Sequence, residues 1–338
     1  MKRFCAVVVV AGLALLSGVV ALSGSNPAGA GQFPGTNGKI AYTKFLGSCE
    51  CYSIWVMNAD GSGDTQLTFG VSGDAEPSWS PDGTRIAFTS SRDGNDEVYV
   101  MNADGSGQTR LTNSPDTDFG PSWSPDGTRI AFVSIRDGNA EVYVMGADGS
   151  GQTNITNNPA NDFYPEWSPD GTRIAFESSR DGLSEVYVMG ADGSGQTNIT
   201  NNPATDVLPE WSPDGTRIAF SRLLGPNYEV FVMGADGSGQ TNITNSPAFD
   251  FGPSWSPDGT RIAFASSRPD APVAEVWVMD TDGTGPTRVT TTVGGVSALA
   301  WQSVPVVPPT TTTTTVAPPT TSPPAVVVAV TATPTFTG

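Results

Sequence analysis

One ten-residue string, WSPDGTRIAF, occurs five times in the chain, and each copy begins 44 residues after the one before it. The copies start at Trp79, Trp123, Trp167, Trp211 and Trp255, and a sixth tryptophan follows at Trp301. A fixed period of about 40–45 residues is typical of a β-propeller, in which each repeat forms one blade. The six tryptophans therefore predict six blades.

Each repeat contains four short strand-like segments separated by turn residues. In the repeat around Trp123 the first segment ends at Trp123 itself, and the others cover residues 129–134, 141–145 and 153–156. The third reads Glu-Val-Tyr-Val-Met without polar alternation, as expected for a strand buried on both faces. We therefore predict an all-β, six-bladed propeller of four-stranded antiparallel blades over residues 31–303.

The two ends of the repeat region complement each other. Residues 39–43, 54–58 and 65–68 form three expected strands before the first full repeat, and one more strand is expected around residues 299–301. We predict that this C-terminal strand joins the three N-terminal strands in a sixth blade. Such a closure leaves no bare sheet edge.

Both termini differ in composition from the repeats. Residues 1–30 have a basic start, an apolar run and an Ala-Gly-Ala end, which predicts a signal peptide cleaved after Ala30, although a retained anchor is the alternative. Residues 304–338 are rich in proline and threonine and carry no charge, which is typical of a disordered tail, either a wall-spanning spacer or an inert extension. We expect an extracytoplasmic protein that is secreted, periplasmic or cell-wall associated, with no membrane span in the mature chain.

The repeat resembles a known family. Pro-x-Trp-Ser-Pro-Asp-Gly, Arg-Ile-Ala-Phe, Glu-Val-Tyr-Val-Met and Ala-Asp-Gly-Ser-Gly together are similar to the WD-like repeats of TolB-type six-bladed propellers, over residues 38–302. TolB itself carries an α/β domain before its propeller, whereas fewer than ten residues separate Ala30 from the first expected strand here. The resemblance implies the fold more strongly than the function, because such propellers serve as binding platforms, as gating domains of peptidases and in several enzymes.

Charge and composition exclude some functions. The chain has no histidine, which removes Ser-His-Asp, Cys-His and imidazole metal sites. Its net charge of −18 disfavours nucleic acid as a partner and favours cations or basic protein surfaces, unless the charge serves only solubility.

Carboxylates recur five residues before each of the first five tryptophans, and Val296 takes this place before the sixth. If the first strands line a central channel, these aspartates ring one mouth, with Glu166 and Glu210 deeper in the same region. Either each aspartate accepts hydrogen bonds from backbone N–H groups of its own or the next blade, or several hold a cation such as Ca²⁺, with Asp118, Asp162, Asp206 and Asp250 as ligands. A glycosidase-like acid pair is a third interpretation. The aspartates are Asp74, Asp118, Asp162, Asp206 and Asp250.

Aromatic residues interleave with these carboxylates, while the two hairpin motifs on the opposite face hardly vary between repeats. Rigid aromatics beside charges suit a recognition surface, although loops facing solvent also vary freely. Our predicted ligand-binding set is therefore Asp74, Asp118, Phe119, Asp162, Phe163, Tyr164, Glu166, Asp206, Glu210, Asp250 and Phe251.

The remaining expectations concern redox state and function. Cys49 and Cys51 lie close enough in sequence to form a strained disulfide or to remain two free thiols. We expect an exported, monomeric, non-catalytic binding or scaffold propeller that recognises a protein or another envelope ligand, with no cofactor beyond the calcium considered above. The alternatives are a carboxylate-dependent carbohydrate-active enzyme and a purely structural repeat protein.

Overall fold

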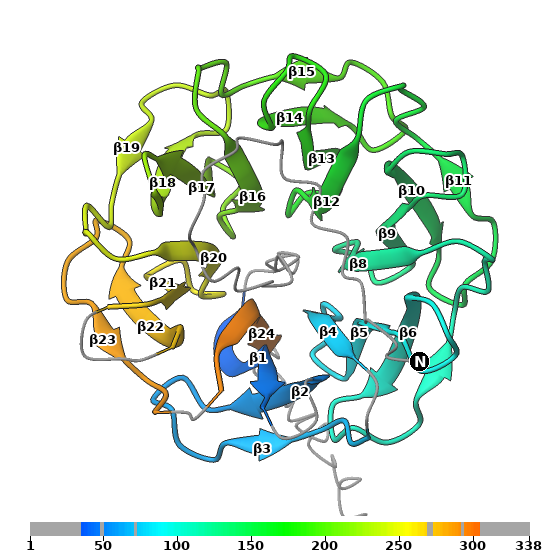
Figure 1. Ribbon diagram of the computed structural model, residues 1–338, viewed down its shortest axis with the longest axis horizontal. Helices are drawn as coiled ribbons and strands as arrows, with labels where there is room; N and C mark the ends of the chain where they lie inside the picture. The colour runs from blue at the N-terminus through cyan, green and yellow to red at the C-terminus, as the bar shows by residue number, and fades with distance from the viewer. Residues whose placement is uncertain (1–34, 48–50, 71–72, 269–272, 292–293, 305–338) are drawn as a thin grey trace, which may run out of the picture. The chain divides into compact units, whose positions relative to one another are not determined.

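The computed structural model describes residues 35–47, 51–70, 73–268, 273–291 and 294–304. Within them the chain forms six four-stranded antiparallel sheets arranged as the blades of a propeller (Figure 1), which confirms the predicted fold class. Blade 1 contains β4 (Asp74–Trp79), β5 (Arg85–Ser90), β6 (Glu97–Asn102) and β7 (Thr109–Arg110). Blade 2 contains β8 (Asp118–Trp123), β9 (Arg129–Ser134), β10 (Glu141–Gly146) and β11 (Thr153–Asn154).

The next three blades repeat this pattern with small changes in length. Blade 3 contains β12 (Asp162–Trp167), β13 (Arg173–Ser178), β14 (Glu185–Gly190) and β15 (Thr197–Asn198). Blade 4 contains β16 (Asp206–Trp211), β17 (Arg217–Leu224), β18 (Asn227–Gly234) and β19 (Thr241–Asn242). Blade 5 contains β20 (Asp250–Trp255), β21 (Arg261–Ser266), β22 (Glu275–Asp280) and β23 (Thr287–Arg288).

Blade 6 is composite, as predicted. Its strand order is β24 (Val296–Val304), β1 (Thr36–Leu46), β2 (Cys51–Met57) and β3 (Thr65–Gln66), so the last strand pairs with the first. Two side chains tie this blade to its neighbours. The amide of Asn37 donates to Asp258 of blade 5 at 2.9 Å, and the amide of Gln302 donates to the carbonyl of Gly83 of blade 1 at 2.8 Å.

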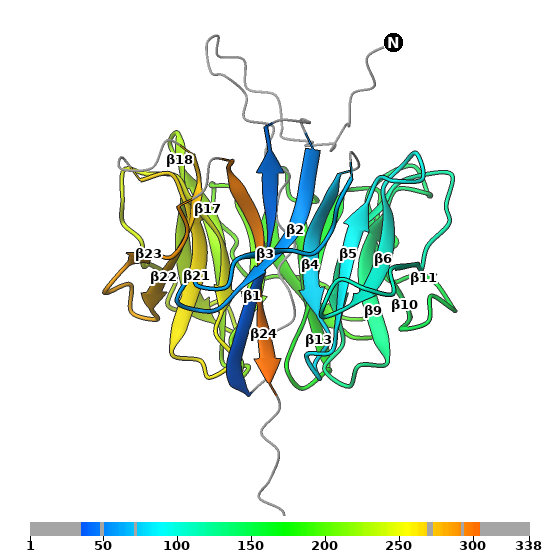
Figure 2. The same ribbon diagram turned by 90° about the horizontal axis from the view of Figure 1, so that it is seen from below.

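The loops that are repeated between blades and the loops that vary between blades lie on opposite faces of the propeller. We call the face where β4 begins at Asp74 the mouth face; it lies on the upper side in Figure 2. The opposite face, here called the hairpin face, carries the Ser-Pro-Asp-Gly and Ala-Asp-Gly turns. These two turns contact each other within one blade, since the N–H of Ala103 donates to the carbonyl of Thr84 at 2.9 Å.

The core lies between blades. Trp123 of blade 2 is fully buried and packs in one cluster with Ala87, Val98 and Val100 of blade 1. The guanidinium of Arg85, also from blade 1, lies 4.6 Å from the centroid of the Trp123 ring, within the range of a cation–π contact. The string WSPDGTRIAF thus supplies the tryptophan that enters one interface and the arginine that covers the tryptophan of the next blade.

Two sequence-based expectations concern the ends of the chain. The predicted signal peptide, residues 1–30, and the tail from residue 305 onward lie outside the described residues. Val304, which we assigned to the tail, is the last residue of β24. In the described part of the chain, no helix has the length and apolar character needed to cross a membrane.

The closure of the ring predicts a stability effect. Trp301 is 1% exposed and packs with residues of both blade 5 and blade 6, so Trp301→Ala should lower the free energy of unfolding by about 3–5 kcal/mol. Urea unfolding measures this change. The matched control is Val304→Ala on the same strand, where the side chain is 42% exposed and the change should stay within about 0.5 kcal/mol. Equal midpoints for both variants would contradict the closure by β24.

Candidate functional site

Six inner strands surround the central axis of the propeller: β4, β8, β12, β16, β20 and β24 (Figure 1). Each carries, three residues before its tryptophan, a residue with a positive φ angle. In blade 3 this residue is Tyr164, with φ of 49°, and the pairing register jumps from Phe163 opposite Glu177 to Glu166 opposite Ala175. This irregularity is a β-bulge, a feature that often re-aims side chains beside functional sites. The residues at this position are Glu76, Gly120, Tyr164, Leu208, Gly252 and Ala298.

The five predicted aspartates all lie at the mouth face, at the start of the inner strands, and all are buried. Each forms an ion pair with an arginine of its own blade. In blade 4, Arg222 binds Asp206 through two bonds of 2.7 and 2.8 Å, and in blade 3 one nitrogen of Arg180 bonds both oxygens of Asp162 at 3.0 and 2.9 Å. The full set of pairs is Asp74 with Arg92, Asp118 with Arg136, Asp162 with Arg180, Asp206 with Arg222 and Asp250 with Arg268.

These ion pairs bear on the calcium interpretation. A hard cation needs about six to eight oxygen ligands, whereas these carboxylates already bond guanidinium groups. Among the described residues, no group of three or more acidic or cysteine side chains is placed to hold a metal ion. The geometry therefore favours the interpretation that the aspartates accept hydrogen bonds within the blades. Their partners are arginine side chains, together with a serine hydroxyl such as that of Ser90 on Asp74, and not the backbone N–H groups that we expected.

The predicted aromatic residues do come together. Tyr164, Val207 and Leu208 form a buried cluster at the mouth face, and Phe119, Phe163, Tyr228 and Phe251 pack against it. The ring centroids of Phe119 and Phe163 lie 6.4 Å apart, across the junction of blades 2 and 3. We call these seven residues the apolar arc. They come from four successive blades, while the corresponding inner-strand positions of blades 1 and 6 hold Ala75, Glu76, Ser297 and Ala298.

Glu166 and Glu210 lie deeper along the axis, directly before their tryptophans, and both are fully buried. Glu166 accepts a hydrogen bond from the hydroxyl of Ser122 at 3.1 Å, and Glu210 accepts one from the N–H of Trp255 at 3.0 Å. Burial, and after it the charge of Glu210, raises the pKa of Glu166 well above its usual range. The closeness of the two buried acids therefore favours the protonated form of Glu166.

Two further buried acids, Glu76 and Glu177, were not predicted from the sequence. Glu76 occupies the bulge position of β4 and accepts hydrogen bonds from the hydroxyl of Thr89 and the N–H of Gly120. Burial raises the pKa of Glu76 to about 8 and that of Glu177 to about 7, although hydrogen bonds from Thr89 and Ser184 act in the opposite direction. A comparison of the repeats could have found both, because no other repeat has an acid at either position.

Of the two cysteines considered for a disulfide, Cys51 lies on the mouth side of blade 6. Cys51, at the start of β2, is buried and disulfide-bonded. Cys49 lies outside the described residues.

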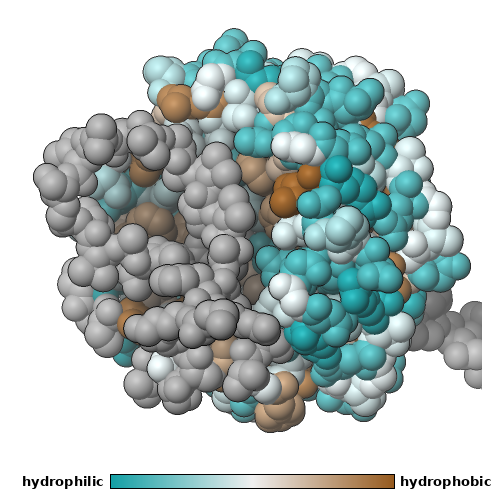
Figure 3. Space-filling view, turned by 45° about the vertical axis from the view of Figure 1, so that its right-hand side comes forward, coloured by the Kyte–Doolittle hydropathy of each residue, from teal (hydrophilic) through white to brown (hydrophobic). Residues whose placement is uncertain are grey.

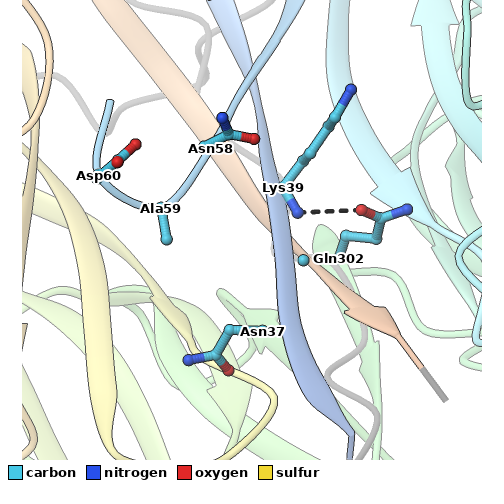
Figure 4. Close-up of a pocket in the computed structure, with 7 residues that line it drawn as sticks. Asn37, Lys39, Asn58, Ala59, Asp60 and Gln302 are labelled. Carbon is cyan, nitrogen blue, oxygen red and sulfur yellow. Dashed lines mark hydrogen bonds between the residues drawn. The ribbon is translucent and has the colours of Figure 1, made fainter. Parts of the chain in front are cut away.

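The hairpin face carries a hollow of about 460 Å³ at the composite blade (Figure 4). It is lined by exposed polar residues such as Asn37, Asn58 and Asp60, and the backbone N–H of Lys39 donates to the side-chain oxygen of Gln302 at 3.0 Å. The side chains of Asn37 and Gln302 also tie this blade to its neighbours. The hollow thus belongs to the closure of the ring.

Exposed apolar residues are few and scattered. Figure 3 shows a mainly hydrophilic surface over the described residues in this view, with isolated hydrophobic residues. Three of the most exposed apolar residues lie on the mouth side of three different blades: Phe69 at 75%, Leu183 at 49% and Leu224 at 43%.

Comparison with known proteins agrees with this propeller architecture. The sequence matches the model of the TolB β-propeller domain over residues 17–119, 111–207 and 195–304. The chain therefore belongs to the TolB β-propeller family. A search of curated protein sequences gives no match.

Solved structures extend the comparison. TolB from Acinetobacter baumannii is similar with 25% identity and a TM-score of 0.71, over 79% of this chain and 67% of that one. A putative TolB from Agrobacterium tumefaciens is similar with 23% identity and a TM-score of 0.61, over 77% and 91%. An oligogalacturonate lyase in complex with manganese shares 14% identity with a TM-score of 0.51, over 76% and 75%, and this likeness concerns the fold alone.

The ion pairs predict that the aspartates contribute to the stability of the fold and that calcium does not. Asp162→Asn should lower the free energy of unfolding by about 3 kcal/mol, because it leaves the largely buried Arg180 without its counter-charge. Chemical unfolding measures this loss, and Asp148→Asn in an exposed turn of the hairpin face is the control. Calcium should leave the melting temperature of the parent unchanged. A melting temperature that rises with calcium in the parent but not in Asp162→Asn would instead support a calcium site.

The raised pKa of Glu177 predicts a pH effect. A carboxyl with a folded-state pKa of about 7 and an ordinary unfolded value near 4.5 holds its proton more tightly in the folded state. The contribution of Glu177 to stability is therefore greatest below about pH 4.5 and falls as the pH rises toward 7, by at most about 1.4 kcal/mol per pH unit. Glu177→Gln should flatten this part of the profile in urea unfolding between pH 5 and 8. Parallel profiles for parent and variant would show that Glu177 titrates normally.

Proposed function

We propose that this protein is an exported, non-catalytic binding propeller whose mouth face recognises a protein or another component of the cell envelope. The observation that carries the proposal is the apolar arc, in which Phe119, Phe163 and Phe251 from three blades lie together at the mouth face. Export is supported by the signal-like residues 1–30. Membership of the TolB β-propeller family is consistent with a binding role.

The arc has the physical properties of a recognition surface. Phe119, Phe163 and Phe251 are only partly buried, so each keeps aromatic surface that a partner can cover. They stand on inner strands and not on long loops, which fixes their positions and lowers the entropy cost of binding. Partly exposed aromatic residues of this kind commonly dominate the binding energy of an interface.

The enzyme alternative rests on Glu166 and Glu210, the adjacent acids near the axis. A carbohydrate-active enzyme needs an acid and a base that reach the substrate from two sides. Both carboxyl groups are fully buried and bond groups of neighbouring inner strands, Ser122 and Trp255. This arrangement favours a role in joining blades. The purely structural alternative does not account for the difference between the apolar arc and the small residues of blades 1 and 6.

The test is capture of envelope components by the purified propeller with cross-linking. The double variant Phe119→Ala and Phe163→Ala gives these positions the residue that blade 1 has at Ala75, so the fold should be preserved. We expect the variant to retain any specific partner at least about tenfold less than the parent, which corresponds to the loss of about 1.4 kcal/mol of binding free energy. Quantitative mass spectrometry of the cross-linked material gives this ratio.

Asp148→Asn on the hairpin face is the matched control and should retain the partner at the parental level. A partner lost equally by both variants, or kept by both, would place recognition elsewhere on the surface.

A further inference from the structure

The buried acids of the described residues fall into three groups. The first consists of the five aspartates paired with arginines. The second consists of the glutamates at or near the start of the third strand in blades 1 to 5, such as Glu141, which accepts hydrogen bonds from Thr156 and from the N–H of Asn158. The third has no such repeated partner, and it consists of Glu76, Glu166, Glu177 and Glu210.

Glu177 lies in a position that has a different function in other blades. The equivalent residues Thr43, Thr89 and Ser221 use their hydroxyl groups to accept a backbone N–H of the next inner strand, for example that of Gly252 on Ser221 at 3.0 Å. A small neutral acceptor is thus sufficient for joining blades at this position. The carboxylate at residue 177 adds a charge that the architecture itself does not require.

The surroundings of Glu177 place it beside the apolar arc. It pairs across β12 with Phe163, and directly opposed residues of antiparallel strands point to the same side of the sheet. Burial, and after it the charges of Glu177 and Asp206, raises the pKa of Tyr228 to about 12, which places Tyr228 near the same carboxylate. Phe163 and Tyr228 both belong to the arc.

The carboxylate of Glu177 is incompletely satisfied. Its side chain is 6% exposed, and its Oε2 atom is buried without a hydrogen-bond partner. None of the ion pairs in the described part of the chain includes it, in contrast to the five aspartates of the mouth face. A buried acceptor of this kind costs free energy that a bound donor recovers.

These observations select the chemistry of a ligand. A positively charged donor would supply the hydrogen bond and the counter-charge that the carboxylate of Glu177 lacks. The adjacent aromatic rings of Phe163 and Tyr228 also attract cations. The net charge of −18 draws positively charged groups toward the protein. The alkyl stem of a lysine or arginine side chain suits the apolar neighbours, since such stems pack on apolar surface while the charged end finds its partner.

We propose that the junction of blades 3 and 4 at the mouth face binds a lysine or arginine side chain of a partner protein, with the charged end on Glu177 and the stem against Phe163, Val207 and Tyr228. The inference rests on the proposed function and specifies what the mouth face recognises. In this proposal Glu177 selects a positively charged side chain, and the apolar arc contributes most of the binding free energy.

The experiment compares two capped peptides, acetyl-Phe-Lys-Leu-amide and its norleucine analogue, which differ mainly in the charged end. Binding to the intact chain is measured from NMR chemical shifts. We expect the lysine peptide to bind at least about tenfold more tightly than the norleucine peptide. Glu177→Ser, which reproduces Ser221 of blade 4, should abolish this difference. Glu177→Gln, which keeps the size of the side chain, should do the same if the serine variant fails to fold.

Glu76→Gln is the matched control, because Glu76 is also a buried acid at an inner strand but already accepts hydrogen bonds from Thr89 and Gly120. This variant should keep the parental preference for lysine. Equal binding of the two peptides, no binding of either, or an unchanged preference in both Glu177 variants would overturn the inference.

The capture experiment separates the two proposals. A partner that depends on Phe119 and Phe163 but not on Glu177 would overturn the lysine or arginine site and support the binding function. A partner that depends on neither would overturn both proposals, because recognition would then lie outside the mouth face.

Discussion

The contact between a tryptophan and the preceding blade is the constraint on which the rest of the structure depends. Each blade is only four strands wide and cannot bury both of its faces alone. Trp123 fills the space between blades 1 and 2, and Arg85 of blade 1 covers its ring. The same pair recurs as Arg129 with Trp167, Arg173 with Trp211 and Arg217 with Trp255. The tryptophan packs at all six interfaces, and the arginine covers it at these four. The tryptophan, the turn and the arginine are therefore repeated without change in the five full blades, and variation is left to the other end of the inner strands.

The sequence allowed the architecture to be predicted because periodicity reports directly on repeated packing. The number of blades, the composite blade and the division into two faces all follow from the spacing of tryptophans and turns. The strand bounds were less accurate at the ends of the chain. We expected a first strand at residues 39–43, whereas β1 covers Thr36–Leu46, since its pairing with both β24 and β2 extends the ladder beyond the apolar residues.

The candidate site could be predicted only in part. The aspartates and the aromatic residues were found from their position before each tryptophan, but their partners were not, because Arg136 lies 18 residues from Asp118 and the pairing depends on the strand register. The bulges at Tyr164 and Leu208 also escaped prediction, since a positive φ is unusual for residues with side chains and the local sequence gives no turn signal. Glu177 would have been found by asking where one repeat departs from the others.

The composite blade described above has a consequence for how the chain reaches its native state. Blades with nearly identical interfaces can dock on the wrong neighbour, or on a second molecule, with little loss of contact energy. Blade 6 breaks this degeneracy, because Asn37 bonds Asp258 and Gln302 bonds Gly83 through side chains that no other blade has at these positions. These two bonds distinguish blade 6 from the other blades, and they favour its docking as the closing blade over the docking of one more standard blade.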